Sequence, residues 1–237
     1  MLVDLESSCR SEAGKLVAGR IWRNIYLNDS KVFLRNRVDE IGNLTVDIVL
    51  DASGSQMNRQ ELISTQGYII AESLTRCQIP VRVSSFCTNS SYTVINLFRD
   101  YLEFGKNDQI FNYHSSGCNR DGLAIRTTLH MMRESPCEHK ILIILSDGKP
   151  IDPCGFPGAV LRPEKNCYSD EDGVNDTARE VRKGRQQGLS VLCVFTGLEE
   201  DLPAAKKIYG NNLVCIKSPE KFAHTVGILI RNELRNM

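Results

Sequence analysis

Several features that mark well-known classes of protein are missing from this sequence of 237 residues. It has 29 basic and 29 acidic side chains, so its formal net charge is zero and its composition does not favour general binding to nucleic acid. Its longest apolar run, at residues 141–145, is far shorter than the roughly 20 residues that a membrane-spanning helix needs. We therefore expect no nucleic-acid partner and no membrane span.

Close cysteine pairs are also missing. None of the nine cysteines belongs to a C-x-x-C pair, which disfavours zinc ribbons and dithiol redox sites. Asp4, Glu6 and Arg10 interrupt the apolar stretch that a secretory signal would need near the N-terminus. These observations predict a cytoplasmic protein with reduced thiols. Cys154 and Cys167, which flank one long loop, are the exception to examine.

Motifs of the common nucleotide-binding and hydrolytic enzymes are absent as well. The sequence contains no G-x-S-x-G elbow, no Walker A motif and no G-x-G-x-x-G. Its 41% hydrophobic and 24% charged residues are ordinary for a globular domain. Its length suits one large domain with an extension. We predict a helical N-terminal lead-in over residues 1–40 and one main domain over residues 41–237.

The main domain alternates apolar, strand-like runs with helical patterns. Several of the strand-like runs are apolar throughout, as in a parallel sheet that is covered on both faces. This pattern predicts an α/β fold with a Rossmann-like, doubly wound and mostly parallel sheet flanked by helices. In such a sheet, ligands bind at the carboxyl ends of the strands. The strand candidates lie at 44–50, 81–86, 93–97, 140–145, 190–195 and 212–216, and the helix candidates at 57–77, 122–133, 174–187, 202–209 and 219–234.

The first of these strands ends in a D-x-S-x-S motif. Asp51, Ser53 and Ser55 place one carboxylate and two hydroxyls at alternate positions of a tight turn, where Gly54 permits the bend. Because the three groups alternate, their oxygens can converge on one point. Hard oxygen donors of this kind suit Mg²⁺ and, less clearly, Mn²⁺ or Ca²⁺. The turn therefore predicts a site for a divalent cation.

Two further segments supply oxygen donors at the same edge of the sheet. Asp147 follows the strand at 140–145, and Asn119 and Asp121 come just before and at the start of a helix. Since ligand sites in such folds lie at the carboxyl ends of the strands, we expect these groups to meet the D-x-S-x-S turn. The residues leave open whether Asn119 or Asp121 is a ligand. We favour Asp121, because a second anion strengthens the binding of a hard cation.

In this order and at these boundaries, the motifs resemble those of a von Willebrand factor A domain with a metal-ion-dependent adhesion site. Asp51, Ser53 and Ser55 match its first motif and Asp147 matches its last, whereas Asn119 stands where the second motif normally has a threonine. The resemblance implies a divalent cation whose open position is completed by an Asp or Glu of a protein partner. It implies binding to a protein and no catalysis.

Two longer stretches narrow the resemblance to one branch. Residues 119–126 (NRDGLAIR) and 145–150 (LSDGKP) are similar to the bacterial cobalt-chelatase and nitric oxide reductase activation (NorD-type) branch. The resemblance implies that the chain works with a partner of the MoxR-type AAA+ ATPase class, and that the two together assemble or activate another protein. It covers the chain from residue 44 onward, whereas residues 1–40 carry no motif that we can name.

Two other functions are alternatives. A Mg²⁺-dependent phosphoryl-transfer hydrolase on a Rossmann-like sheet could use Asp51 as its nucleophile. Phosphatases of that kind have a second Asp two positions later, where this sequence has Ser53. A purely structural domain would bind no metal, and its acidic and hydroxyl side chains would instead cap helices and turns.

Overall fold

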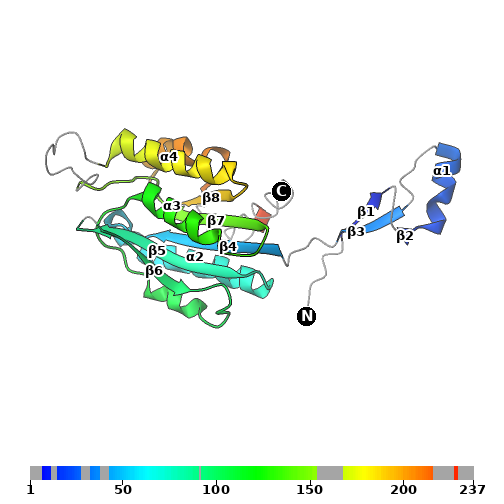
Figure 1. Ribbon diagram of the computed structural model, residues 1–237, viewed down its shortest axis with the longest axis horizontal. Coiled ribbons are helices and arrows are strands. Elements are labelled where there is room, and N and C mark those ends of the chain that lie inside the picture. The colour runs from blue at the N-terminus through cyan, green and yellow to red at the C-terminus, as the bar shows by residue number, and fades with distance from the viewer. Residues whose placement is uncertain are drawn as a thin grey trace. The chain divides into compact units, whose positions relative to one another are not determined.

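The computed structural model describes residues 7–11, 15–27, 33–37, 43–90, 92–153, 168–215 and 227–228 (Figure 1). The chain divides into two compact units, Met1–Gly42 and Asn43–Met237, and each is described by itself. The closing helix expected over 219–234 lies outside the described residues apart from 227–228, as do Cys154 and Cys167. No helix in the described ranges is long and apolar enough to cross a bilayer.

The first unit contains a small antiparallel sheet and one short helix. Strands β1 (Ser7–Ser11), β3 (Phe33–Arg37) and β2 (Lys15–Leu16) pair in that order, and η1 (Ala18–Arg20) leads into helix α1 (Ile21–Leu27). The lead-in that we predicted to be helical therefore contains three strands in addition to a helix, and the prediction missed those strands. Polar sequences such as SSCRS in β1 lack the apolar alternation that marks a strand, and β1 depends on pairing with distant β3.

A six-stranded sheet forms the centre of the second unit and confirms the predicted α/β fold. All neighbouring strands are parallel except the edge pair β5 and β6, and the strand order is β6-β5-β4-β7-β8-β9. The first strand of this sheet, β4, lies in its middle. The chain next adds β5 and β6 on one side of β4, and then β7, β8 and β9 on the other side. The carboxyl ends of β4 and β7 are therefore neighbours at the point where the winding changes direction. The bounds are β4 (Leu44–Asp51), β5 (Val81–Asn89), β6 (Tyr92–Arg99), β7 (His139–Ser146), β8 (Ser190–Phe195) and β9 (Leu213–Cys215).

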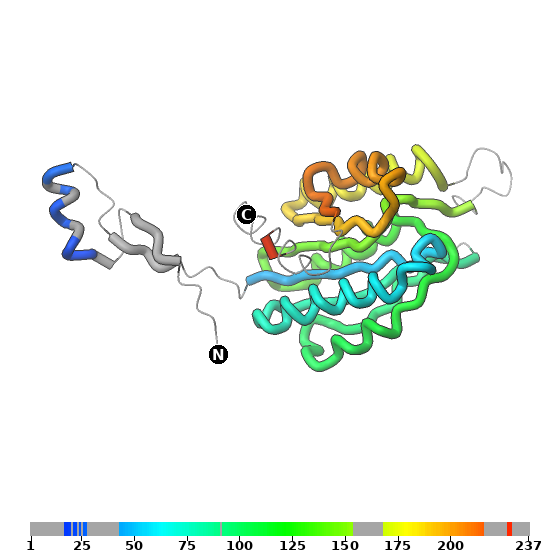
Figure 2. Tube along the Cα trace, turned by 180° about the vertical axis from the view of Figure 1, so that it is seen from behind, coloured from blue at the N-terminus to red at the C-terminus, as the bar shows by residue number. Residues whose placement is uncertain are grey.

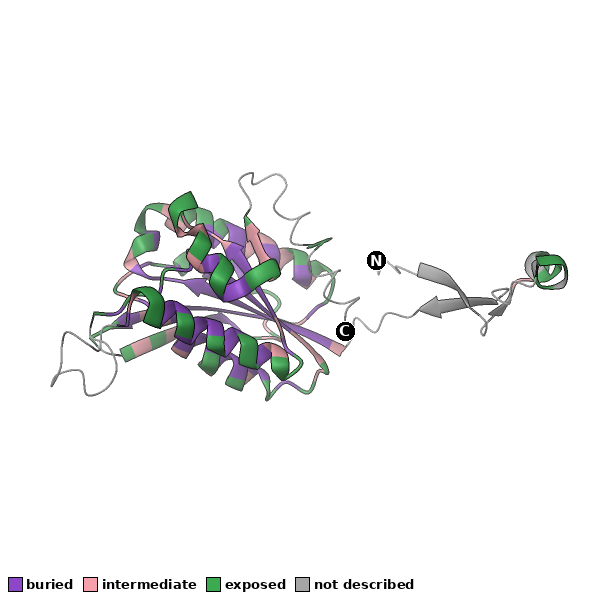
Figure 3. Cartoon of the chain, turned by 90° about the horizontal axis from the view of Figure 1, so that it is seen from above, coloured by how far each residue is buried: buried purple, intermediate pink, exposed green. Residues whose placement is uncertain are grey.

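Helices cover both faces of this sheet (Figures 1 and 2). Alternate side chains of β4 enter two separate apolar cores, with Ile48 and Leu50 on the α2 side and Val49 on the α3 side. Both faces of the central strands are therefore buried, as Figure 3 shows. One face carries α2 (Gln60–Arg76) and η4 (Asn107–Asn112), and the other carries α3 (Asp121–Met132), α4 (Asp170–Gln186) and α5 (Leu202–Tyr209). The remaining short segments are η3 (Gly54–Arg59), η7 (Glu199–Asp201) and η8 (Gly210–Asn212).

Helix α4 begins earlier than the apolar pattern predicts. Its first turn consists of Asp170, Glu171 and Asp172, which we expected in a loop. Acidic side chains stabilise the positive end of the helix macrodipole, so this run is favourable here although it has no apolar periodicity. The earlier start places Asp170 and Glu171 beside the turn that follows β7.

Candidate metal centre

Three aspartates meet at the edge where the sheet changes its winding direction. Strands β4 and β7 pair with Leu50 opposite Leu145, so the turns that contain Asp51 and Asp147 leave the sheet next to each other. Helix α3 begins with Asp121 at the same edge. The chain thus brings together three carboxyl groups from three separate segments.

A buried serine connects two of the three carboxyls. Asp51, Asp121 and Asp147 are 0%, 1% and 2% exposed. The Ser146 hydroxyl lies 3.2 Å from Asp51 Oδ2 and 3.4 Å from Asp121 Oδ2, and it accepts a 3.0 Å hydrogen bond from the Gly148 backbone N–H. Sequence reasoning did not single out Ser146. Its position at the end of an otherwise apolar strand is the signal that could have found it.

The two serines of the first motif reach across to the last motif. Ser53 Oγ and Ser55 Oγ lie 3.0 Å apart, and Ser55 donates a 2.6 Å hydrogen bond to Asp147 Oδ2. Asp51 Oδ1 accepts a 2.9 Å hydrogen bond from the backbone N–H of Ser53, which holds the turn in place. Ser53 is buried and Ser55 is exposed, so the site opens to solvent at Ser55.

Asn119 and Asp121 differ in what their oxygens contact. Asn119 Oδ1 accepts a 2.9 Å hydrogen bond from the backbone N–H of Ile151, and Asn119 Nδ2 donates one of 3.4 Å to Asp51 Oδ2. The side-chain oxygen of Asn119 is therefore already engaged. Asp121 Oδ1, in contrast, is buried and has no hydrogen-bond partner within the described ranges. Of the two residues, Asp121 has the oxygen that is better placed to accept a cation.

Burial raises the pKa values of all three carboxyls, and repulsion among them adds to the rise for Asp51 and Asp121. Burial, reinforced by the charge of Asp147, raises the pKa of Asp51 to about 7. Burial also raises the pKa of Asp121 well above its usual range, and the charges of Asp51 and Asp147 add to the rise. The pKa of Asp147 is raised by burial, although the Ser55 hydroxyl stabilises its charge. A divalent cation would oppose these shifts, because it stabilises the ionised carboxylates.

The donors at this edge decide which cation would fit. In the part of the chain that the structure describes, no three His, Cys, Asp or Glu side chains form a cluster that could hold a metal ion by themselves. A cation here would therefore need the hydroxyl oxygens of Ser53 and Ser55 in addition to carboxylates. An all-oxygen set of this kind fits Mg²⁺, Mn²⁺ or Ca²⁺ and does not fit zinc or copper. The unpartnered Asp121 oxygen and the crowded carboxyls are the two features that favour a cation.

Further polar side chains hold the first motif in position. Tyr113 donates a 2.5 Å hydrogen bond to the backbone carbonyl of Asp51. The Arg59 guanidinium donates to the backbone carbonyl of Thr196, and the Thr196 hydroxyl donates a 3.3 Å hydrogen bond to Gln56 Oε1. Sequence reasoning did not identify these residues, because each contact joins segments that are far apart in the chain.

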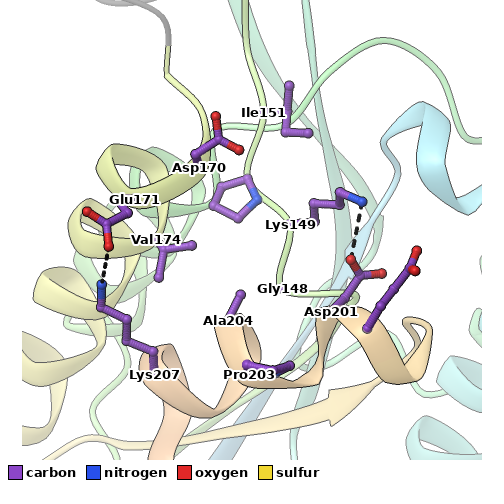
Figure 4. A pocket seen from close by; sticks show the side chains of 12 residues that line it. Gly148, Lys149, Ile151, Asp170, Glu171, Val174, Asp201, Pro203, Ala204 and Lys207 are labelled. Carbon is purple, nitrogen blue, oxygen red and sulfur yellow. Dashed lines mark ion pairs between the residues drawn. The ribbon is translucent and has the colours of Figure 1, made fainter.

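A pocket of about 380 Å³ adjoins the last motif (Figure 4). Gly148 and Lys149, which follow Asp147 directly, form one wall, and the first turns of α4 and α5 form the others. Lys149 Nζ lies 3.2 Å from Asp201 Oδ1, and the hydrogen bond and charge of Asp201 raise the pKa of Lys149. The positive charge beside Asp147 is therefore already paired.

Comparisons with known sequences find one matching family model and two curated relatives. Residues 32–97 match the model of the cobalamin biosynthesis protein CobT VWA domain. The chain is 23% identical over 163 residues to the protein YojO of Bacillus subtilis (strain 168), and 28% identical over 104 residues to Protein NorD of Stutzerimonas stutzeri. These matches cover 65% and 44% of this chain, but only 23% and 15% of the two relatives. The chain therefore spans less than a quarter of the length of the curated relatives it matches.

Solved structures share the fold at low sequence identity. The PilB minor pilin from Streptococcus sanguinis has a TM-score of 0.59 and 17% identity, over 81% of this chain and 62% of that chain. The vWF domain of the type V pili tip protein Mfa5 from Porphyromonas gingivalis has a TM-score of 0.59 and 12% identity, over 81% of this chain and 95% of that chain. BatB from Bacteroides thetaiotaomicron has a TM-score of 0.56 and 12% identity, over 81% of this chain and 99% of that chain. At these identities, the likeness shows the fold alone.

The sheet order and the solved structures give the second unit the fold of a von Willebrand factor A domain. In sequence, the chain is similar to the CobT VWA domain over residues 32–97 and to Protein NorD over 104 residues.

Proposed function

We propose that this domain binds another protein through a divalent cation, and that it does so without catalysing a reaction. The observation that carries the proposal is the group of three buried carboxyls, of which Asp121 keeps one oxygen without a hydrogen-bond partner in the described ranges. Buried carboxyls that are neither paired nor neutralised destabilise a fold. A cation would supply the missing positive charge, and a module that exposes it can accept a carboxylate from a partner.

In this proposal the residues of the chain have separate tasks. Asp51, Asp121 and Asp147 provide charge, and Ser53 and Ser55 provide neutral oxygens, with Ser55 on the side that opens to solvent. Asn119 holds the turn by its hydrogen bonds to Ile151 and Asp51 and is not a direct ligand. When bound, Mg²⁺ would supply an open coordination position for an Asp or Glu of the partner. Mn²⁺ and Ca²⁺ are alternatives with the same donor preference.

A MoxR-type AAA+ ATPase is the partner class that we propose. The support is the similarity in sequence to the CobT and NorD branch, together with the motifs at 119–126 and 145–150. A pull-down of the ATPase with the wild-type chain, in Mg²⁺ and in EDTA, would test the pairing. Capture that does not depend on Mg²⁺ would contradict a cation-bridged contact.

The first experiment is thermal unfolding of the whole chain against Mg²⁺, Mn²⁺ and Ca²⁺. A ligand that binds only the folded state stabilises it by about 2.7 kcal/mol at a hundredfold excess over its dissociation constant, so a functional site gives a measurable shift. We expect the shift in wild type and not in Asp51→Ala. Asp108→Asn, which removes an exposed carboxylate from η4 on the opposite face of the sheet, is the control and should keep the shift. No shift in wild type with any of the three ions would count against the site.

The catalytic alternative finds no support in the geometry of Asp51. A nucleophile must reach its substrate, and this carboxylate has no exposed surface. We therefore expect that wild type, in the presence of Mg²⁺, hydrolyses p-nitrophenyl phosphate no faster than the Asp51→Ala variant does. Turnover by the wild type that is lost in this variant would favour the hydrolase instead.

A further inference from the structure

The pocket beside Asp147 joins an apolar floor to an acidic rim. Val174 of α4 and Ala204 of α5 lie at its base, and Ile151 forms part of one side (Figure 4). Val174 is buried, whereas Ile151 remains 37% exposed although it is a large apolar residue. A pocket of about 380 Å³ falls at the small end of the usual range for ligand sites and suits one long side chain.

The rim carries more negative than positive charge. Asp170, Glu171, Glu200 and Asp201 face two lysines, which leaves a formal charge of −2 (four carboxylates against two ammonium groups). Both lysines are engaged within the rim, because Lys149 lies 3.2 Å from Asp201 and Lys207 lies 3.8 Å from Glu171. Asp170 and Glu200 form no ion pair with any residue that the structure describes. Within the described ranges, these two carboxylates of the rim therefore have no ion-pair partner of their own.

The pocket lies next to the candidate metal centre, because Gly148, which lines it, directly follows Asp147 in the chain. Gly148, which follows Asp147, has a φ of +68°, and a Cβ at this position would lie 2.8 Å from the Cβ of Ala205. Only glycine therefore allows α5 to pack this closely against the turn. Ile151 lies four positions after Asp147, a span of at most about 14 Å. A single short segment of a partner can reach both places.

We propose that this pocket receives an arginine or lysine side chain of the same partner segment whose acidic residue reaches the cation. The inference rests on the proposed function and adds a second recognition element to it. The aliphatic part of the side chain lies against Ile151, Val174 and Ala204, and its charged end lies between Asp170 and Glu200. A segment with only acidic side chains is repelled by this rim, so the pocket selects among acidic partners.

The test uses the full chain, isotope-labelled for NMR, and two peptides that differ in one charge. The peptides are N-acetyl-Asp-Ala-Ala-Arg-amide and the same peptide with citrulline, which has nearly the same shape as arginine but no charge. In Mg²⁺ we expect the arginine peptide to bind about fivefold more tightly than the citrulline peptide. The largest changes in chemical shift should occur at the backbone amides of residues 148–151, 170–174 and 200–207. The double variant Asp170→Asn, Glu200→Gln should bind both peptides equally. Asp108→Asn, with an exposed charge removed elsewhere, should keep the preference for arginine.

The Asp51→Ala variant separates this inference from the proposed function. If the cation site is functional, the variant loses the effect of Mg²⁺ on peptide affinity but keeps the preference for arginine over citrulline. If Mg²⁺ does not change the peptide affinity of wild type, but wild type still prefers arginine to citrulline, the proposed function is contradicted and the inference about the pocket is supported. Equal binding of the two peptides to wild type, or arginine-dependent shifts away from the pocket, would overturn the inference.

Discussion

Ser55 and Asp147 lie 92 positions apart in the sequence, yet the Ser55 hydroxyl donates a 2.6 Å hydrogen bond to Asp147 Oδ2. This contact joins the first and last motifs of the candidate site, and Ser55 is exposed while Asp147 is buried. A cation that is bound at this edge would contact solvent, or a partner, on the side of Ser55.

Replacing Ser55 by alanine should therefore weaken Mg²⁺ binding and hardly change stability. The variant loses one neutral donor and the orientation of Asp147, for which we expect about a tenfold loss in affinity. Since Ser55 is exposed, the free energy of unfolding in EDTA should stay close to that of wild type. Calorimetric titration with Mg²⁺ measures the affinity. Ser73→Ala, at an exposed serine of α2, is the matched control, and an equal loss in both variants would refute a specific role for Ser55.

Asp121 and Asn119 can be told apart by the same titration. Asp121→Asn removes a charge and an unpartnered oxygen, so Mg²⁺ binding should fall below detection. Asn119→Ala removes the hydrogen bonds to Ile151 and Asp51, so it should lower stability by about 1 kcal/mol and weaken the binding of Mg²⁺ without abolishing it. The reverse order of effects would identify Asn119 as the ligand.

The metal-free domain should become less stable as the pH rises from about 4 to about 7. The folded state raises the pKa of Asp51 to about 7, against about 3.9 in an unfolded chain, so the folded state binds more protons in this interval. Stability then falls with rising pH, by at most about 1.4 kcal/mol per pH unit for one carboxyl, and levels off above the folded pKa. Urea unfolding in EDTA at several pH values measures the slope.

Asp51→Asn provides the control for this pH dependence. The amide cannot ionise, so the slope should become shallower in the variant. Because protons and Mg²⁺ compete for the same carboxyls, stabilisation of the wild type by Mg²⁺ should also be larger at pH 8 than at pH 6. A metal-free stability that increases from pH 5 to pH 7 would contradict the assignment of the raised pKa to Asp51.

Gly122 should not tolerate a side chain. A Cβ at this position would lie 2.2 Å from Asp176 Oδ2 and 2.9 Å from the hydroxyl of Tyr168, so these two side chains, which are hydrogen-bonded to each other and buried, would have to move. We expect Gly122→Ala to destabilise the domain by about 1–3 kcal/mol, measured by urea unfolding. Gly105→Ala is the control, since a Cβ there would meet no atom within 4 Å. Equal stability of the two variants would show that the helices can adjust.

The strands that carry the site could be predicted because their ends are visible in the sequence. Asp51 and Asp147 each come at the end of a largely apolar strand, and a doubly wound sheet puts such positions at one edge. The early start of α4 could not be predicted in this way, because its first turn has only acidic side chains and no apolar period. The strands of the first unit were missed for a similar reason.

Buried polar contacts were harder to predict than the strands. Asp47 lies in the middle of β4 and is 2% exposed, where its charge interrupts the apolar pattern. Its carboxylate accepts a 2.6 Å hydrogen bond from Arg82 Nε, which is 35 residues away, and another hydrogen bond from Tyr101. Only the pairing of β4 with β5 brings Asp47 and Arg82 together, so no local pattern reveals the contact.

The Ser146 hydroxyl has two carboxyl neighbours but only one hydrogen. It can donate to Asp51 or to Asp121, and its lone pairs already accept the backbone N–H of Gly148. At any instant one of the two carboxyls therefore lacks this donor, so the two cannot be solvated alike as anions. Asp51 also accepts hydrogen bonds from the Ser53 N–H and from Asn119, whereas Asp121 Oδ1 has no partner in the described ranges, so the metal-free pair is asymmetric and holds negative charge more readily on Asp51.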